Sequence, residues 1–156
     1  MSPEETNFSG HETRLFPAAH ISSVREAEIR ATASLLAMLK AVSEFGRTIV
    51  RHAGGPVGRL FCYTEVPFKL RQRGGRPPEI IRPDGVISAT RGARQWSALV
   101  EVKVGKNPLG ADQVNKYHRL AGQEGFDAVI TISNQPAQAN GLPPVRLDGR
   151  LRQQKT

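Results

Sequence analysis

The stretch at residues 96–104, which reads WSALVEVKV, constrains the fold of this chain more than any other. Its β-branched, aromatic and apolar residues favour a β-strand. Strand alternation divides the stretch into two faces, Leu99, Glu101 and Lys103 on one and Val100, Val102 and Val104 on the other. The valine face has to be covered by a hydrophobic core. The sequence therefore predicts a sheet with apolar cover on that side, and an acid and a base that point together to the opposite side.

Two helices are predicted around this strand. The first begins at Ser22 or Ser23, where Glu26 completes a capping box, and apolar residues recur at helical spacing up to Gly46, which is expected to end it. The second spans residues 110–125. It starts near Asp112, where a carboxylate suits the helix dipole, and ends at Gly125.

Residues 60–70 and 80–90 also read as strands, joined by a basic Gly/Pro loop, and Pro67 indicates an edge or a bulge. A short extended piece is predicted at 48–50 and a tight turn at 53–58. That glycine-rich turn lacks the Lys-Ser/Thr of a phosphate loop. Residues 127–133 form a short, almost wholly apolar run, typical of a strand buried on both faces.

The predicted order is helix, three strands, helix, strand, which gives an α/β fold. We expect one core domain at residues 23–133, because 156 residues suffice for one hydrophobic core and hardly for two. An irregular N-terminal arm (1–22) precedes it and a basic Pro/Gly-rich tail (134–156) follows it. With no apolar run of about 20 residues and no signal-like start, a cytoplasmic location is expected. Cys62 is the only cysteine, so it is expected to be a small apolar residue in a strand.

The charge balance favours a polyanionic partner. The chain has 22 Lys and Arg against 14 Asp and Glu, a formal net charge of +8, with a pI near 10.4. Binding to phosphates would release counterions, so we expect nucleic acid as the partner and a steep fall of affinity with salt. The expected contacts are loop residues Arg71, Arg73 and Arg76, together with arginines of the C-terminal tail (Arg146, Arg150 and Arg152).

Asp84 is a second acidic residue that the predicted sheet can bring close to Glu101 and Lys103. It follows Pro83 and opens the strand of residues 80–90, and a turn at 91–95 lets that strand pair with the next as a hairpin. Asp84 can then lie beside Glu101. Two such carboxylates repel unless a cation lies between them, and their oxygens suit Mg²⁺, with Mn²⁺ as an alternative. Lys103 could then orient or deprotonate an attacking water or stabilise charge on a phosphate. The alternative is a Glu–Lys pair on an exposed sheet face.

The motif Pro83-Asp84 followed by Glu101-Val102-Lys103 resembles the signature of the PD-(D/E)XK nuclease superfamily. The predicted element order over residues 23–133 also resembles the αβββαβ core of that family, a restriction-endonuclease-like mixed sheet flanked by helices. The resemblance implies that Asp84, Glu101 and the Val102 carbonyl bind the catalytic Mg²⁺, and that Lys103 assists the nucleophile. It further implies a hydrolase that cleaves DNA.

Two further matches extend the resemblance. Gln113 and Tyr117 form Q-x-x-x-Y on the second helix, as in the RecB-type branch, where these residues shape the site and engage DNA; spacing alone is equally compatible with ordinary helix residues. Family members often carry a metal-directed Glu on the first helix. Glu28 is the choice here because Glu26 has a capping role, and Glu65 is a weaker rival.

Three functions remain open on sequence alone. The first is a Mg²⁺-dependent deoxyribonuclease. The second is a non-catalytic nucleic-acid- or partner-binding module on the same fold, although Asp84, Glu101 and Lys103 are all retained. The third is a small basic RNA-binding protein without a catalytic site. Because the family's added specificity domains are missing, we expect a minimal or truncated member, or one to which a second copy or a partner protein supplies specificity.

Overall fold

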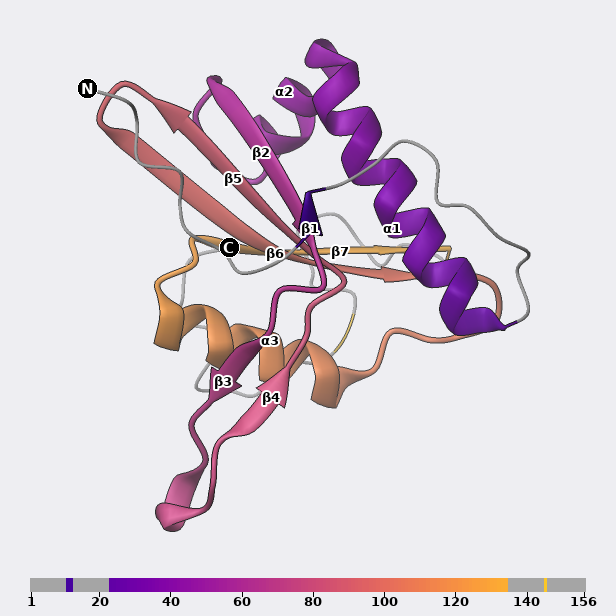
Figure 1. The fold of residues 1–156 in the computed structure, drawn as a ribbon, viewed down its shortest axis with the longest axis vertical. Helices are drawn as coiled ribbons and strands as arrows, with labels where there is room; N and C mark the ends of the chain where they lie inside the picture. The colour runs from indigo at the N-terminus through magenta and orange to yellow at the C-terminus, as the bar shows by residue number, and fades with distance from the viewer. Residues whose placement is uncertain (1–10, 13–22, 135–144, 146–156) are drawn as a thin grey trace.

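The computed structural model describes residues 11–12, 23–134 and 145, and its centre is a mixed β-sheet with helices on both faces (Figure 1). The sheet order is β1-β2-β5-β6-β7, and every neighbouring pair is antiparallel except β6 and β7, which are parallel. The predicted α/β architecture is confirmed at this level. The strands are β1 (His11–Glu12), β2 (Arg59–Thr64), β5 (Gly85–Arg91), β6 (Arg94–Lys103) and β7 (Ala128–Ser133).

Strands β5 and β6 form the predicted hairpin. Their register pairs Gly85 with Val100 at one end and Arg91 with Arg94 at the other. The connecting turn is tighter than the predicted 91–95, and Gly92 adopts a left-handed conformation there (φ 59°). Glycine takes up that conformation without the steric cost of a Cβ, and such a tight turn matches the twist of the paired strands.

The first helix is shorter than predicted, because the chain turns a corner at Val42. Helix α1 (Val24–Ala41) is capped by Ser23, whose Oγ accepts a hydrogen bond from the Glu26 amide at 3.2 Å. Helix α2 (Ser43–His52) then runs through Gly46 and residues 48–50, so the predicted helix end and the predicted extended piece are both wrong. A Cβ on Gly46 would lie 2.3 Å from the Leu39 carbonyl oxygen, so the glycine permits close packing of the two helices.

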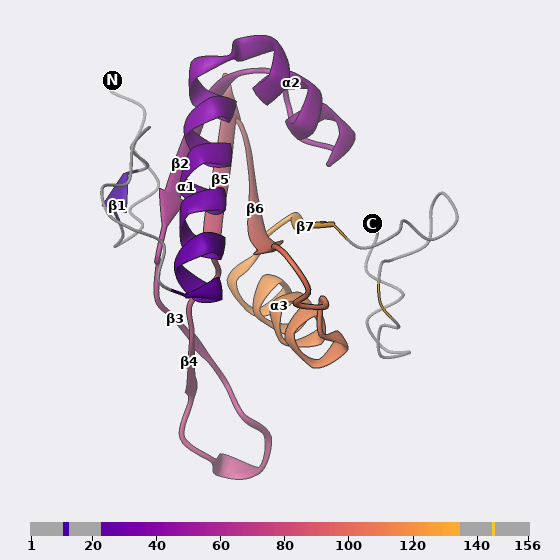
Figure 2. The same ribbon diagram turned by 90° about the vertical axis from the view of Figure 1, so that its right-hand side faces the viewer.

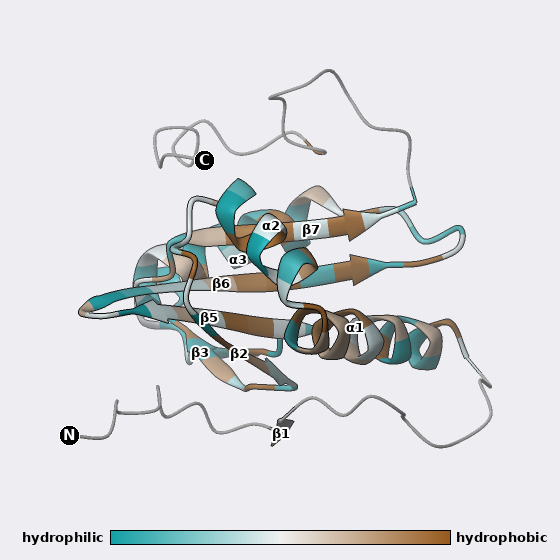
Figure 3. Cartoon of the chain, turned by 90° about the horizontal axis from the view of Figure 1, so that it is seen from above, coloured by the Kyte–Doolittle hydropathy of each residue, from teal (hydrophilic) through white to brown (hydrophobic). Residues whose placement is uncertain are grey.

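Two hydrophobic clusters cover the two faces of the sheet. The valine-face cluster lies under α1 and α2, and the α3-face cluster lies under α3 (Ala111–Glu124); the two helix layers stand on opposite sides of the sheet in Figure 2. Apolar residues run through β5, β6 and β7 between these layers (Figure 3). Buried members of the valine-face cluster include Leu36, Leu39, Cys62, Ile87, Trp96, Val100 and Val102, and those of the α3-face cluster include Val66, Leu70, Ile81, Leu99, Tyr117 and Leu120.

The strands predicted at residues 60–70 and 80–90 are each divided into two, and the two pieces nearest each other in sequence form a second, two-stranded sheet. Strands β3 (Phe68–Leu70) and β4 (Glu79–Ile81) pair antiparallel and continue into a loop with one 3₁₀ turn, η1 (Arg73–Gly75). We call residues 68–81 the arm, which projects away from the main sheet (Figures 1 and 2). Glu65, with φ 57°, and Pro67 lie where β2 ends, and Pro83 lies before β5. Proline has no amide hydrogen to donate to a ladder, which explains the breaks near it.

Strand β7 differs from its prediction in burial. All six of its residues are half-buried, not buried on both faces, because β7 lies at the end of the sheet order within the part of the chain that the structure describes. The N-terminal segment predicted as irregular contributes the short strand β1, and the rest of that segment lies outside the described residues. No helix among the described residues has the length and apolar character that crossing a membrane requires.

Gly85 sets how closely α1 approaches the sheet. A Cβ built on it would lie 2.6 Å from Leu36 Cδ1 and 3.5 Å from Thr32 Cγ2, both of α1. Contacts under 3.0 Å require a neighbour to move. A residue with a side chain at this position would therefore push against the helix that carries Glu28.

Candidate active site

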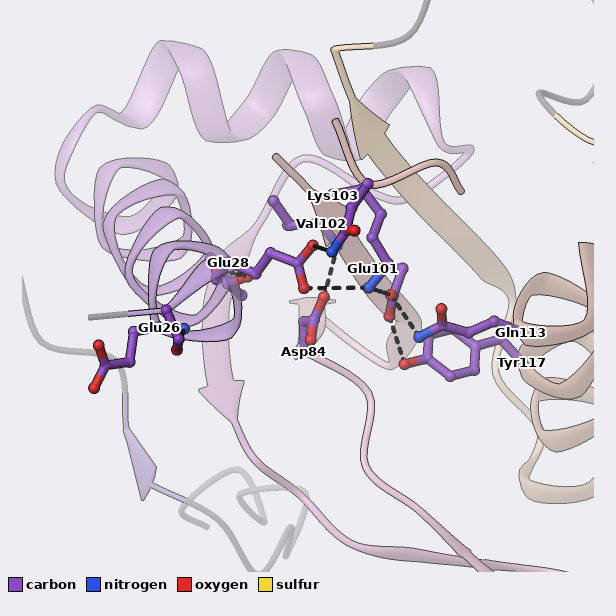
Figure 4. A network of polar contacts seen from close by, with 11 residues as sticks. Glu26, Glu28, Asp84, Glu101, Val102, Lys103, Gln113 and Tyr117 are labelled. Carbon is purple, nitrogen blue, oxygen red and sulfur yellow. Dashed lines mark hydrogen bonds and ion pairs between the residues drawn. The ribbon is translucent and has the colours of Figure 1, made fainter. Parts of the chain in front are cut away.

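Asp84 and Glu101 meet where the β5–β6 hairpin ends. Gly85, the first residue of β5, pairs with Val100 in an antiparallel register. Asp84, one residue earlier, therefore lies opposite Glu101. The Val102 amide donates a hydrogen bond of 2.8 Å to Asp84 Oδ2, which fixes that carboxylate beside the β6 backbone. The hairpin thus brings together the two carboxylates that the sequence predicted to be neighbours (Figure 4).

Glu101 is fully buried, with 0% of its surface exposed, and three donors hold its carboxylate. The Tyr117 hydroxyl donates to Oε2 at 2.5 Å, and the Gln113 side-chain amide donates to Oε1 at 2.6 Å. Lys103 Nζ forms an ion pair with the same Oε1 at 2.6 Å. The exposed Glu–Lys pair considered from sequence is therefore wrong for Glu101, and Gln113 and Tyr117 of α3 do face the site.

Glu28 reaches the cluster from the other side of β6 (Figure 4). It lies on α1, is 8% exposed, and its Oε2 is 3.4 Å from Lys103 Nζ. Glu26 lies in the first turn of α1, where its backbone amide donates to the Ser23 cap, and Glu65 is exposed at the corner after β2. The choice of Glu28 among the three agrees with the geometry.

Asn107 is a member of this cluster that sequence reasoning missed. Its side-chain amide donates to Glu28 Oε1 at 3.2 Å, so Glu28 is held between Asn107 and Lys103. Asn107 belongs to the turn after β6, in the run GKNP. Asparagine is common in turns for its own conformational reasons, so its presence there carried no signal of a site.

The pKa values of the cluster reflect crowded carboxylates around one cation. Burial, with repulsion from Glu101 and Glu28, raises the pKa of Asp84 to about 6 against the opposing effects of the Val102 amide and Lys103. Burial would lower the pKa of Lys103, but its hydrogen bond to Glu101 and the charges of Glu101, Glu28 and Asp84 outweigh burial and raise it. Burial and Glu101 likewise raise the pKa of Tyr117. Lys103 is thus an ammonium and Tyr117 a hydroxyl donor at neutral pH.

The donor chemistry of the cluster fits a hard divalent cation. Asp84, just before β5, and Glu101 on β6 offer oxygen ligands side by side, and the pKa of Asp84 is raised first by burial and then by repulsion from Glu101, a repulsion that a cation between them would relieve. Among the residues the structure describes, no three His, Cys, Asp or Glu side chains converge as a metal cluster. Mg²⁺ commonly uses only one or two carboxylates, with waters and substrate phosphates completing its shell. The Val102 carbonyl is the further oxygen ligand that the sequence motif suggests.

The three loop arginines lie elsewhere. Arg71, Arg73 and Arg76 are exposed on the arm and take no part in the carboxylate cluster. The arginines predicted in the C-terminal tail fall outside the described residues.

Cys62 is buried in β2, as predicted, and burial raises the pKa of its thiol to about 12. A thiol in that environment stays protonated and does not act as a nucleophile.

Comparison with protein-family models, with curated proteins and with solved structures found no significant match to this chain.

Proposed function

We propose that this chain is a metal-dependent nuclease of the PD-(D/E)XK type that hydrolyses phosphodiester bonds of DNA. The observation that carries the proposal is the convergence on one largely buried cluster of Asp84, Glu101 and Lys103, from β6 and the residue before β5, with Glu28, Gln113 and Tyr117, from two helices. The order of α1, β2, β5, β6, α3 and β7 supports the restriction-endonuclease-like core as the finer description of the fold.

Each residue has a role in this mechanism. Asp84, Glu101 and the Val102 carbonyl would hold Mg²⁺ or Mn²⁺, which as a Lewis acid polarises a phosphate and activates water. Lys103 supplies a positive charge at the cluster, where it stabilises negative charge that builds on the phosphate. Its ion pairs with Glu101 and Glu28 fix the ammonium beside the carboxylates, where it can serve this electrostatic role.

The remaining residues position these groups. Tyr117 and Gln113 fix both oxygens of Glu101, so the carboxylate does not reorganise when charge develops nearby. Glu28 pairs with the ammonium of Lys103 from the α1 side, and Asn107 holds the other carboxylate oxygen of Glu28. Such support is what keeps a reactive group within the narrow geometry that catalysis needs.

A cleavage assay tests the proposal directly. Labelled single- and double-stranded DNA and RNA would be incubated with the pure protein and Mg²⁺, Mn²⁺ or EDTA. We expect DNA cleavage with either metal and none in EDTA. Absence of cleavage of every substrate with both metals would overturn the proposal.

Two substitutions separate the roles within the cluster. Glu101→Gln removes the negative charge, so metal binding and cleavage should be lost together. Lys103→Ala keeps both carboxylates and should still bind metal and DNA, but cleave slower by roughly 10²-fold or more, the scale of losing a positioned electrostatic group. Lys40→Ala is the matched control, an exposed lysine near the far end of α1. Wild-type cleavage by Lys103→Ala would assign Lys103 to a structural ion pair.

One observation favours the non-catalytic module as a second candidate. Glu101 is wholly buried with both carboxylate oxygens already bonded, which is also what a purely structural polar network looks like. A module of this kind would bind nucleic acid equally in Mg²⁺ and EDTA and cleave in neither. Titration of Mg²⁺ followed by a change in Tm separates the two functions, since only the nuclease should be stabilised by the ion through Asp84 and Glu101.

A further inference from the structure

The arm concentrates positive charge on a thin, exposed element. Residues 68–81 carry four basic side chains and one acidic one, so the arm supplies +3 of the chain's net charge of +8, and the basic Arg82 follows it directly. The single acid, Glu79, is already ion-paired with Lys116 of α3 at 2.6 Å. The basic residues are all exposed: Lys69, Arg71, Arg73, Arg76 and Arg82.

Contacts with α3 hold the base of the arm in place. Gln123 of α3 donates to the Lys69 carbonyl at 2.7 Å and accepts from the Arg71 amide at 2.8 Å. Arg119 donates to the Arg71 carbonyl at 3.2 Å. Leu70 and Ile81, one from each strand of the arm, are buried in the α3-face cluster. The arm is therefore a fixed projection at its base.

The tip of the arm turns on two exposed glycines. Gly74 and Gly75 both have positive φ, 71° and 70°, and neither would meet an atom within 4 Å if it carried a Cβ. Glycine there serves the tight turn rather than packing. Pro77 and Pro78 follow and restrict the returning chain to extended conformations.

The arm is linked directly to the carboxylate cluster. Strand β4 ends at Ile81, three residues before Asp84. Helix α3 contacts the arm through Gln123 and Arg119 and holds Glu101 through Tyr117. At about 3.3 Å per extended residue, the eight residues from Arg76 to Asp84 span at most about 26 Å. On B-form DNA this reach corresponds to no more than about seven or eight base pairs at roughly 3.4 Å per pair.

Building on the proposed nuclease function, we propose that the arm enters the major groove of double-stranded DNA within about eight base pairs of the scissile phosphate. The B-form major groove, about 12 Å wide, admits a two-stranded β-ribbon without deformation of the DNA, whereas the minor groove, about 6 Å wide, would first have to be widened. The major groove of A-form RNA is too deep and narrow for such an element, and a single strand offers no groove. The substrate class is therefore duplex DNA.

Binding measured in EDTA tests this inference without any cleavage. Duplex DNA, duplex RNA and single-stranded DNA of one sequence would be titrated with wild type, with the double variant Arg73→Ala/Arg76→Ala, and with Arg51→Ala/Arg91→Ala. The last pair is exposed and lies away from the arm, on α2 and at the β5–β6 turn, and it removes the same charge.

Wild type should prefer duplex DNA. The arm variant should lose about tenfold or more of that affinity, with the slope of log affinity against log salt smaller by about 2, as for two lost phosphate contacts. The control pair should stay within about twofold. Equal losses from the two double variants, or equal affinity of wild type for all three polymers, would overturn the inference.

A second experiment asks which groove is used. Duplex DNA whose cytosines carry a bulky glucosyl group at C5 has a filled major groove, and wild type should bind it as weakly as the arm variant binds plain DNA. A minor-groove drug should leave wild-type binding nearly unchanged. The opposite pattern would overturn the groove assignment.

Different outcomes would disprove the arm inference and the nuclease proposal. Arm-dependent binding of duplex DNA without cleavage in Mg²⁺ or Mn²⁺ would end the nuclease proposal and leave the arm as a DNA-binding element. DNA cleavage by an enzyme whose arm variant matches its control in binding would end the arm inference alone.

Discussion

The two faces of β6 are equally buried and chemically opposite. Val100 and Glu101 are neighbours in sequence, and each has 0% of its surface exposed. Val100 lies in an apolar cluster under α1 and α2, whereas Glu101 faces α3 with three polar donors on its carboxylate. Burial by itself does not separate a structural face from a functional one. A carboxylate kept at full burial with both oxygens bonded distinguishes this face from the valine face, and removing one of its partners should be costly.

Introducing a charge on the valine face of β6 should have the largest effect on stability. Val100→Glu would place a carboxylate in the apolar valine-face cluster and should cost about 4 kcal/mol or more of unfolding free energy, a large fraction of the roughly 5–15 kcal/mol of a typical domain. Far-UV circular dichroism with urea titration measures this. Val100→Ala is the control, expected to lose about 2 kcal/mol from lost burial and a small cavity. A stable Val100→Glu protein would mean that the two faces are not as different as described.

Removing one donor from the polar face should have an intermediate effect. Tyr117→Phe deletes only the hydroxyl that donates to Glu101 Oε2 and leaves that buried oxygen without this partner. The expected loss is about 1–3 kcal/mol. In a Glu101→Gln background the same change should cost less, and a double-mutant cycle from urea unfolding gives the coupling energy. A coupling near zero would show that the hydroxyl and the carboxylate do not depend on each other.

Asp84→Asn should have the smallest effect and the opposite sign. The pKa of Asp84 is raised to about 6 in the folded chain, so between about pH 4 and pH 6 the folded state holds a proton that the unfolded state releases. Wild-type stability in EDTA should therefore fall as pH rises through this window. Asn keeps an oxygen for the Val102 amide and carries no charge, so the variant should be more stable at pH 7.5, on the order of 1 kcal/mol after allowance for solvent screening.

Thermal unfolding between pH 4 and pH 8 checks the titration. The wild-type and Asp84→Asn curves should converge near pH 4 and separate above pH 6. If the wild-type and Asp84→Asn curves of stability against pH stay parallel across the range, the pH dependence of stability comes from a group other than Asp84.

Local patterns were sufficient to predict the centre of the molecule. Alternation in WSALVEVKV assigned Glu101 and Lys103 to one face, and the short turn after residue 91 was enough to pair Asp84 with Glu101. Both predictions depend on period-2 geometry and on one tight turn, which are local properties. The selection of Glu28 over Glu26 followed from a capping box, which is also local.

The features that were mispredicted depend on distant contacts. Gly46 reads as a helix stop, but its role is set by the Leu39 carbonyl that packs against it. Strand β7 has a buried-strand composition, yet its partial exposure follows from its position at the end of the sheet formed by the described residues. Asn107 belongs to the site only because the turn after β6 brings it to Glu28 of α1. None of these contacts has a sequence period that a local pattern could detect.

The carboxylate cluster is also sensitive to substitution of Gly85, which mutating only its charged residues would not reveal. Leu36 of α1 rests almost on the Gly85 backbone, so the height of that helix above the sheet is set by the absence of a side chain. Glu28 is on the same helix, two turns earlier, and its reach to Lys103 and Asn107 depends on that height. A larger residue at position 85 would displace the Leu36 side chain and disturb the packing of the helix that carries Glu28, although every polar group remained present. Gly85 therefore sets the distance between α1 and the sheet, and the geometry of the carboxylate cluster depends on this glycine as well as on Asp84.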